Sequence, residues 1–176
     1  MKVTHETWQE RLANLNRRRE AEVIKNAFPA VDDYKSHVYK CHIGKKVIDV
    51  GCGLQIIKPY IEELGFEYNG LDIPNVCIPP PDYEGTIEEN NFFDKVFDTA
   101  YLFMVIDGVR DIEIAAKELK RITKTNIVIL NGINIHPDRY HTINITEEVL
   151  QLAFGDLRQG YREWITDKVL LTEYLL

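Results

Sequence analysis

A Gly-x-Gly turn and an aspartate about twenty residues later are the residues of this chain best suited to bind a ligand. The turn, at 51–53, follows the apolar run 46–50, which predicts a buried strand that bends sharply toward a helix. Glycine lets the backbone approach a ligand because no Cβ stands in the way. Asp72 ends a second run, 68–72, and its carboxylate can accept hydrogen bonds from both hydroxyls of a ribose. The spacing predicts a nucleoside-cofactor site.

Two histidines could carry proton transfer. His136 and His141 lie in the largely polar segment 131–145, and an imidazole has an ordinary pKa suited to proton transfer near neutral pH. We place His141 first because the Tyr140-His141 pair lies between the fifth strand and the next predicted helix, so that two fixed elements would hold it. The alternative is that both histidines only pack within the loop.

Three segments between 46 and 130 carry a family resemblance. The run 47–53, Val-Ile-Asp-Val-Gly-Cys-Gly, is similar to the first motif of class I S-adenosylmethionine-dependent methyltransferases. Leu-Asp-Ile at 71–73 is similar to their ribose-binding strand end, and 97–130 to their fourth strand, the following helix and the fifth strand. The chain resembles the small, single-domain, type 11-like members of that class.

The resemblance implies a fold, a cofactor and a set of contacts. The fold is Rossmann-like α/β, a mostly parallel sheet with helices on both faces and a C-terminal antiparallel hairpin. The cofactor is S-adenosyl-L-methionine. The implied cofactor-binding residues are Asp49, Gly51, Cys52, Gly53, Asp72, Ile73, Thr86, Ile87, Tyr101 and Leu102.

The sequence also departs from the family pattern. Gln55 stands where many members have a third glycine, and Asp107-Gly108 replaces the Glu-His pair that often follows the fourth strand. Because the Glu-His pair is replaced, the family pattern does not assign a general base in this chain. Asp107 is kept as a second candidate for the base or as a ligand for the ammonium group of the cofactor. Thr86 replaces a common aspartate beside the adenine.

A nicotinamide cofactor is the main alternative for the glycine turn. A dinucleotide fingerprint needs a third glycine that allows the helix to pack closely on the strand. Ile56 occupies that position, and Asp49 stands just before the turn. Both residues favour the methyltransferase interpretation.

The elements that must position these residues follow one another in regular order. Helices are expected at 6–28, 32–42, 57–64, 111–122 and after Thr146, and strands at 46–50, 68–72, 83–87, 98–105, 127–130, 161–166 and 169–176. Tyr34, Val38 and Tyr39 of the second helix should face the core. The prolines at 79–81 forbid a helix, so the connection between the second and third strands should be an extended loop.

In an open α/β sheet, ligands bind beyond the carboxyl ends of the strands, which brings the turn, Asp72 and the loop 131–145 around one cleft.

The chain of 176 residues is long enough for one sizeable core, so we expect a single methyltransferase domain over 1–176. Residues 1–45 form its N-terminal helical segment and 46–176 its Rossmann-like core. By resemblance, the N-terminal segment could be a lid over the cofactor. The alternative is a helix that only packs on the sheet.

Composition limits the partners. The net charge of −7 repels a polyanion, so nucleic acid is an unlikely partner, and the basic run 17–19 is expected to be a solvated helix face. The three cysteines lack C-x-x-C spacing and the histidines are not clustered, which predicts no disulfide framework and no metal site. The sequence shows no apolar run long enough for a membrane span and no apolar signal core, so a cytoplasmic location is expected. A homo-oligomer is compatible with this composition.

The predicted function is methyl transfer from S-adenosylmethionine to a small-molecule or glycan-type acceptor by in-line displacement, with a base only where the acceptor must lose a proton. Two other functions stay open: a catalytically inactive, methyltransferase-like binding subunit and a nicotinamide-dependent Rossmann enzyme. The residues expected to line the acceptor side are Tyr101, Met104, Asn131, Tyr140 and His141.

Overall fold

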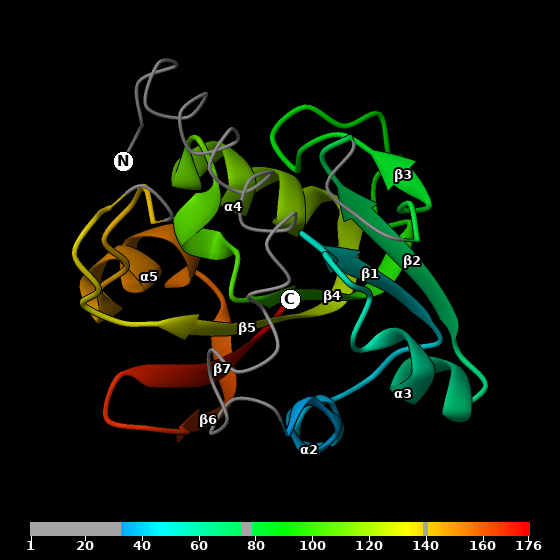
Figure 1. Cartoon of the computed structure of the whole chain (residues 1–176), viewed down its shortest axis with the longest axis horizontal. Helices are drawn as coiled ribbons and strands as arrows, with labels where there is room; N and C mark the ends of the chain where they lie inside the picture. Colours follow the sequence, from blue (N-terminus) through cyan, green and yellow to red (C-terminus); the bar gives the residue numbers. More distant parts are fainter. Residues whose placement is uncertain (1–32, 75–78, 139–140) are drawn as a thin grey trace.

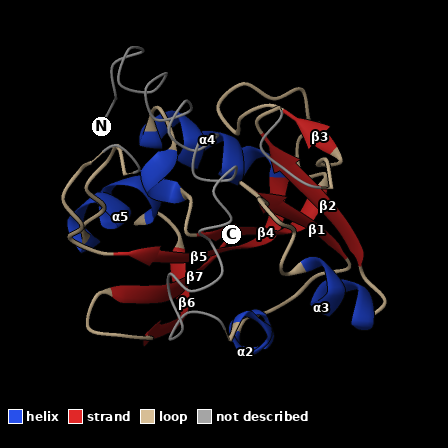
Figure 2. Cartoon of the chain, viewed as in Figure 1, coloured by secondary structure: helices blue, strands red, loops and turns tan. Residues whose placement is uncertain are grey.

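The computed structural model of the chain describes residues 33–74, 79–138 and 141–176. In this part of the chain, seven strands form one sheet in the order β3-β2-β1-β4-β5-β7-β6 (Figures 1 and 2). Strands β1 to β5 run parallel, β7 is antiparallel to β5, and β6 is antiparallel to β7. This confirms the predicted fold class. The strands are β1 (Lys46–Val50), β2 (Glu67–Asp72), β3 (Tyr83–Glu84), β4 (Phe97–Phe103), β5 (Thr123–Gly132), β6 (Arg158–Trp164) and β7 (Val169–Leu175).

Local signals fix the ends of the helices. Asp111 caps α4 by accepting hydrogen bonds from the backbone N–H groups of Glu113 and Ile114. Thr146 caps α5 in the same way, and Gly65, with φ +72°, ends α3 in the left-handed conformation that glycine adopts readily. The described helices are α2 (Tyr34–Lys40), α3 (Lys58–Glu63), the short 3₁₀ helix η2 (Ile106–Gly108), α4 (Ile112–Ile122) and α5 (Glu147–Phe154).

Two hydrophobic layers form the core, one on each face of the sheet. Successive strand residues point to opposite faces, so Ile48 packs with α4 and α5 whereas Val47 packs with α2 and α3. In Figure 1, α4 and α5 lie together on one side and α2 and α3 on the other. The carboxyl ends of β1, β2 and β4 are left at one edge, where the predicted site lies.

The structure differs from the predicted elements in detail. Strand β3 covers two residues rather than 83–87, because Gly85, with φ +150°, turns the chain and donates its N–H to the Asp72 carbonyl. The fifth strand is longer than predicted and begins directly after α4. Tyr39 does not face the core: it is 38% exposed, and its hydroxyl lies 3.3 Å from Glu63 of α3.

Some expectations lie outside the described residues. The helix predicted at 6–28, the proposed lid, is one of them. Among the residues that the structure describes, no helix has the length and apolar character needed to cross a membrane.

Candidate functional site

The glycine turn after β1 is held against the end of β2. The backbone N–H groups of Gly51 and Cys52 both donate to the Leu71 carbonyl, at 2.8 and 3.2 Å. Gly51 has φ +69°, and a Cβ there would lie 2.2 Å from a methyl group of Val105. Glycine is therefore required at this position for two reasons: the left-handed backbone conformation and the close contact with Val105. Cys52 is buried, and its sulfur packs against Gly70.

Asp72 stands at the carboxyl end of β2 with its carboxylate already oriented. One oxygen accepts a 2.8 Å hydrogen bond from the N–H of Gly53, and the other accepts one of 2.8 Å from Ile73. Each carboxylate oxygen can accept more than one hydrogen bond, so the group can still receive hydroxyl donors of a ligand. Asp72 is half-buried, at the rim of the glycine turn.

Asp49, two residues before the turn, is a buried carboxylate. Only 4% of the residue is exposed, and the Tyr68 hydroxyl donates a 2.8 Å hydrogen bond to it. Burial raises the pKa of Asp49 to about 7; the Tyr68 hydrogen bond opposes this rise and the charge of Asp72 adds to it. The hydrogen-bond partner is a neutral phenol. A cationic ligand group placed beside Asp49 would therefore favour its ionised form.

A pocket of about 120 Å³ opens beside Asp49 and the turn. One wall is aromatic: Tyr34 of α2 stacks on Phe103 at the end of β4, with ring centroids 5.9 Å apart. An aromatic face next to a carboxylate suits a desolvated cation. The lining residues are Tyr34, Asp49, Gly51, Cys52, Gly53, Leu54, Ile56, Ile57 and Phe103. The sequence predicts that Tyr34 faces the core and gives it no role in the site, and its position at the start of α2 carries no signal for one.

Gln55 and Met104 adopt left-handed backbone close to the pocket, although neither is glycine. Gln55 has φ +55° where the family often has glycine, so the backbone requirement persists although the residue type has changed. Met104, with φ +57°, follows β4 and donates its N–H to the Leu130 carbonyl. A residue other than glycine in this conformation lowers the stability of the fold by about 1–3 kcal/mol. It keeps the conformation because the surrounding structure holds it in place.

Asp107 and His141 form an ion-pair contact across 34 residues of sequence. The Asp107 carboxylate meets His141 Nδ1; the side chains are 8% and 26% exposed. The Asp107 carbonyl also accepts hydrogen bonds from the backbone N–H groups of Thr142, at 3.1 Å, and Ile143, at 3.0 Å. The loop after β5 is thus fastened to η2 next to the histidine.

This pair lies close to the glycine turn. Phe103 lines the pocket, and Val105 packs on Gly51. Asp107 follows Val105 by two residues, which limits the separation of their Cα atoms to about 7 Å. The structure therefore brings the Asp107–His141 pair to the same edge of the sheet as Asp49 and Asp72. Sequence reasoning had kept Asp107 as a reserve group and had not paired it with His141.

Other predicted site residues are placed differently. Tyr101 and Leu102 are fully buried, and the Tyr101 hydroxyl donates to the Val38 carbonyl at 3.3 Å. Ile87 is buried in the core beside α4, and Asn131 is buried with its amide bonded to Gly132. These side chains offer a ligand little surface, and their assignment to the site stays a prediction. Of the remainder, Ile73, Thr86 and Met104 are half-buried, His136 is exposed, and Tyr140 lies outside the described residues.

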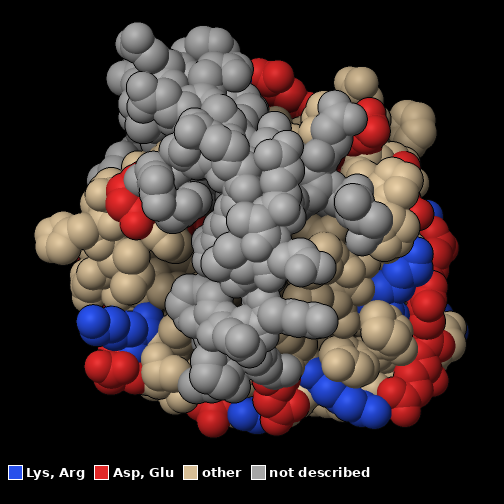
Figure 3. Space-filling model, viewed as in Figure 1, with Lys and Arg blue, Asp and Glu red and all other residues tan. Residues whose placement is uncertain are grey.

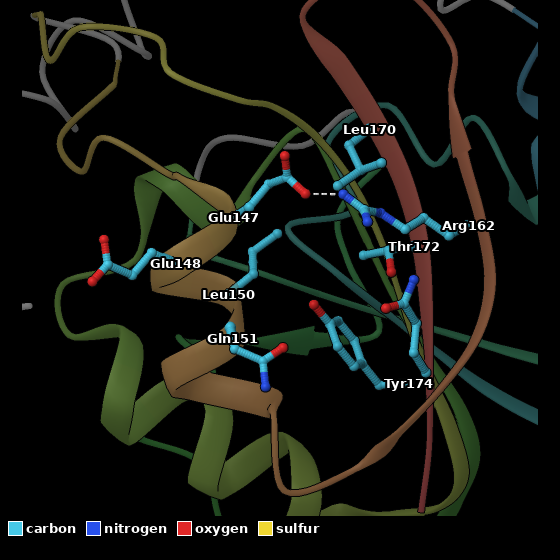
Figure 4. A pocket seen from close by; sticks show the side chains of 9 residues that line it. Glu147, Glu148, Leu150, Gln151, Arg162, Leu170, Thr172 and Tyr174 are labelled. Atoms are coloured by element: carbon cyan, nitrogen blue, oxygen red, sulfur yellow. Dashed lines mark hydrogen bonds and ion pairs between the residues drawn. The ribbon is translucent and has the colours of Figure 1, made fainter.

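A second pocket, of about 280 Å³, lies between α5 and the β6–β7 hairpin (Figure 4). Arg162 of β6 reaches across it to pair with Glu147 of α5. No residue predicted for the site lines it. Although it is larger, it lacks the glycine turn and the buried carboxylate found at the first pocket. Among the described residues, no group of three or more histidine, cysteine or acidic side chains could hold a metal ion.

Comparison with known proteins adds a family and a fold. The chain matches a family described as methyltransferase domain over residues 9–132. No match was found among curated proteins. Similar solved structures include a protein from Pyrococcus horikoshii, with 16% identity, TM-score 0.72 and coverage of 88% of this chain and 93% of that one. A SAM-dependent methyltransferase from Aquifex aeolicus has 14% identity, TM-score 0.67 and coverage of 88% and 95%. Magnesium protoporphyrin IX methyltransferase from Synechocystis, solved with bound SAM, has 15% identity, TM-score 0.62 and coverage of 82% and 77%.

Proposed function

The chain belongs to the class I S-adenosylmethionine-dependent methyltransferases, and we propose that it methylates a hydroxyl of a small-molecule or glycan-type acceptor with His141 as general base. Family membership makes it an enzyme whose cofactor is S-adenosyl-L-methionine, and it argues against the nicotinamide alternative. The observation that carries the proposal is the Asp107–His141 pair beside the glycine turn.

The residues around the turn suit this cofactor. Asp49 is a buried carboxylate with a raised pKa and a neutral partner, and we assign it to the ammonium of the methionyl part. Asp72 would receive the ribose hydroxyls. The stacked Tyr34 and Phe103 rings would face the sulfonium, whose positive charge they can stabilise. A pocket of about 120 Å³ is smaller than a whole-ligand site, which supports its assignment to the methionyl end alone.

When bound, the cofactor would supply an electrophilic methyl group: an acceptor oxygen attacks the methyl carbon in line as the C–S bond breaks, and the demethylated cofactor leaves as a neutral thioether. The chain supplies the proton acceptor. If His141 Nδ1 carries the hydrogen that is shared with Asp107, Nε2 keeps its lone pair and can accept the hydroxyl proton. The buried Asp107 carboxylate then stabilises the imidazolium that forms.

The charges of the described surface support a small acceptor. Acidic and basic side chains lie next to each other along the rim of the face seen in Figure 3. Several lysines pair with carboxylates at 2.8 Å, including Lys35 with Glu63 and Lys46 with Glu67. Paired lysines attract a polyanion weakly, and the net charge of −7 repels it. A hydroxyl acceptor is favoured over a thiolate or a neutral amine because only the hydroxyl needs the base.

Substitution of the two histidines tests this function. His141→Ala should lower turnover on a panel of hydroxyl acceptors by about a hundredfold to ten-thousandfold and leave cofactor affinity nearly unchanged. His136→Ala is the matched control, because His136 is exposed in the same loop. Formation of demethylated cofactor measures turnover, and calorimetry measures affinity. Wild-type turnover in both variants would remove His141 as the base.

A further inference from the structure

We propose that Gln55 is a positioning residue for the adenosine side of the cofactor site, because its side chain fastens the proline loop, residues 79–82, to the glycine turn. The inference rests on the cofactor position proposed above. It assigns a role to the residue that replaces the family's third glycine.

The proline loop needs a donor from elsewhere in the chain. Pro79, Pro80 and Pro81 have no backbone N–H, and extended proline segments form no hydrogen bonds of their own. The loop is closed at its base, where the N–H of Gly85 donates to the Asp72 carbonyl at 2.8 Å. That bond fixes the two ends of the connection but not the carbonyls of the prolines between them.

Gln55 supplies these donors. Its side-chain Nε2 donates to the carbonyls of Pro79, at 3.2 Å, and Pro80, at 2.9 Å. Lys58 Nζ lies 3.3 Å from Gln55 Oε1, and an ammonium can only donate, so the amide oxygen faces Lys58 and both amide hydrogens face the loop. Gln55 is 5% exposed, so its side chain lies buried beneath the exposed prolines of the loop.

The backbone at this position gives a second reason to assign a role to the side chain. With φ +55°, residue 55 has a conformation that glycine adopts freely and glutamine adopts under strain. Glycine would relieve the strain but could not reach the loop. The side-chain bonds are what the glutamine adds.

The same turn orients the ribose carboxylate. The N–H of Gly53, two residues before Gln55, donates to Asp72 at 2.8 Å, and the proline connection begins directly after Asp72. Asp82, at the far end of the loop, accepts a 2.7 Å bond from the N–H of Gly70 in β2. Gln55 and Asp82 thus hold the loop from two sides, and Gln55 is the one that ties it to the turn.

Two substitutions test the role. Gln55→Gly removes the donors and the backbone strain together, so the melting temperature should stay close to that of the wild type. Gln55→Glu keeps the length but presents a carboxylate to the two carbonyls. Both should raise the dissociation constant for S-adenosylmethionine about tenfold, as measured by calorimetry without an acceptor. At saturating cofactor, kcat of Gln55→Gly should equal that of the wild type, so that the change appears in KM alone.

Gln159→Glu is the matched control. It makes the same charge change on the exposed strand β6, away from the turn, and should leave cofactor affinity unchanged. Wild-type affinity in both folded Gln55 variants would overturn the proposal. An affinity loss that appears only with a lower melting temperature would also overturn it, because it would show a purely structural role. Failure of the His141 base would show instead as wild-type turnover in His141→Ala, whatever the Gln55 variants do.

Discussion

At the scale of single residues, the site combines two carboxylates with different environments. Asp72 is half-buried, and its carboxylate accepts hydrogen bonds from two backbone N–H groups. Asp49 is buried and has a phenol for a partner, so its pKa rises to about 7. If Asp49 holds the ammonium of the cofactor as proposed, we expect cofactor binding to depend on pH, because a buried carboxylate with a pKa near 7 gains much from a cationic ligand group.

We expect Asp49 to reduce the stability of the cofactor-free protein as pH rises. An aspartate carboxyl ordinarily titrates at 3.8, so between pH 4 and 7 the folded state holds a proton that the unfolded state has released. Stability therefore falls through this window, and the loss is complete above pH 7. Relative to the wild type, Asp49→Asn should therefore gain about 2 to 4 kcal/mol of stability between pH 5 and pH 8. Denaturant unfolding at both pH values measures the difference.

The control for that measurement is Glu148→Gln, since Glu148 is an exposed carboxylate on α5. It should leave the pH dependence as it is in the wild type. Equal stability differences between Asp49→Asn and the wild type at pH 5 and 8 would show that Asp49 titrates normally.

At the scale of elements, signals between neighbouring residues were sufficient to predict where helices begin and end. Contacts between distant segments of the chain could not be predicted in this way. The caps at Asp111 and Thr146 and the glycine at 65 involve residues within one helical turn, and the predicted helix bounds 57–64, 111–122 and after Thr146 agree closely with α3, α4 and α5. The Asp107–His141 pair could not be predicted, because it depends on how the loop after β5 folds over η2. Tyr34 and Tyr39 lie on the same short helix, yet one lines the pocket and the other is exposed; helix spacing alone did not separate them.

Removal of the α4 cap should weaken the layer of helices beside the sheet. Asp111 accepts from the N–H of Glu113 at 3.1 Å and of Ile114 at 3.4 Å. Asp111→Ala should lower the free energy of unfolding by about 0.5–2 kcal/mol, whereas Asp111→Asn keeps an acceptor and should lower it by much less. Urea unfolding of the two variants measures this. Equal losses in both would mean that charge rather than capping explains the effect.

At the scale of the whole molecule, the strand order decides where the site forms. Strand β1 lies between β2 and β4, so the chain leaves β1 toward one side of the sheet and returns on the other. A ligand site at this switch point is a property of the fold, so the strand order supports the position predicted for the cofactor half of the site. The acceptor half is assigned to a loop, where the sequence pattern contains no periodic signal, and its residues stay a prediction.

Cofactor binding should stabilise the whole domain. Ligand at about a hundredfold over its dissociation constant adds about 2.7 kcal/mol, which for a chain of this length is a melting shift of about 5 to 10 °C. S-adenosylmethionine and its demethylated product should both produce it. NAD at the same concentration is the control and should shift the melting temperature much less. A larger shift with NAD would contradict the assignment of the glycine turn.

The hydrogen bonds from Thr142 and Ile143 to the Asp107 carbonyl have a consequence for how the enzyme can diversify. They use backbone groups, so most replacements of the side chains around them keep the loop in place. The glycine turn and Asp72 belong to other segments of the chain and make none of these bonds. Under the proposed function, exchange of residues 134–137 should therefore change acceptor preference and leave the cofactor half as it is, whereas the buried Ile133 and the Asp138 carboxylate, which accepts from the N–H of His141, should be kept.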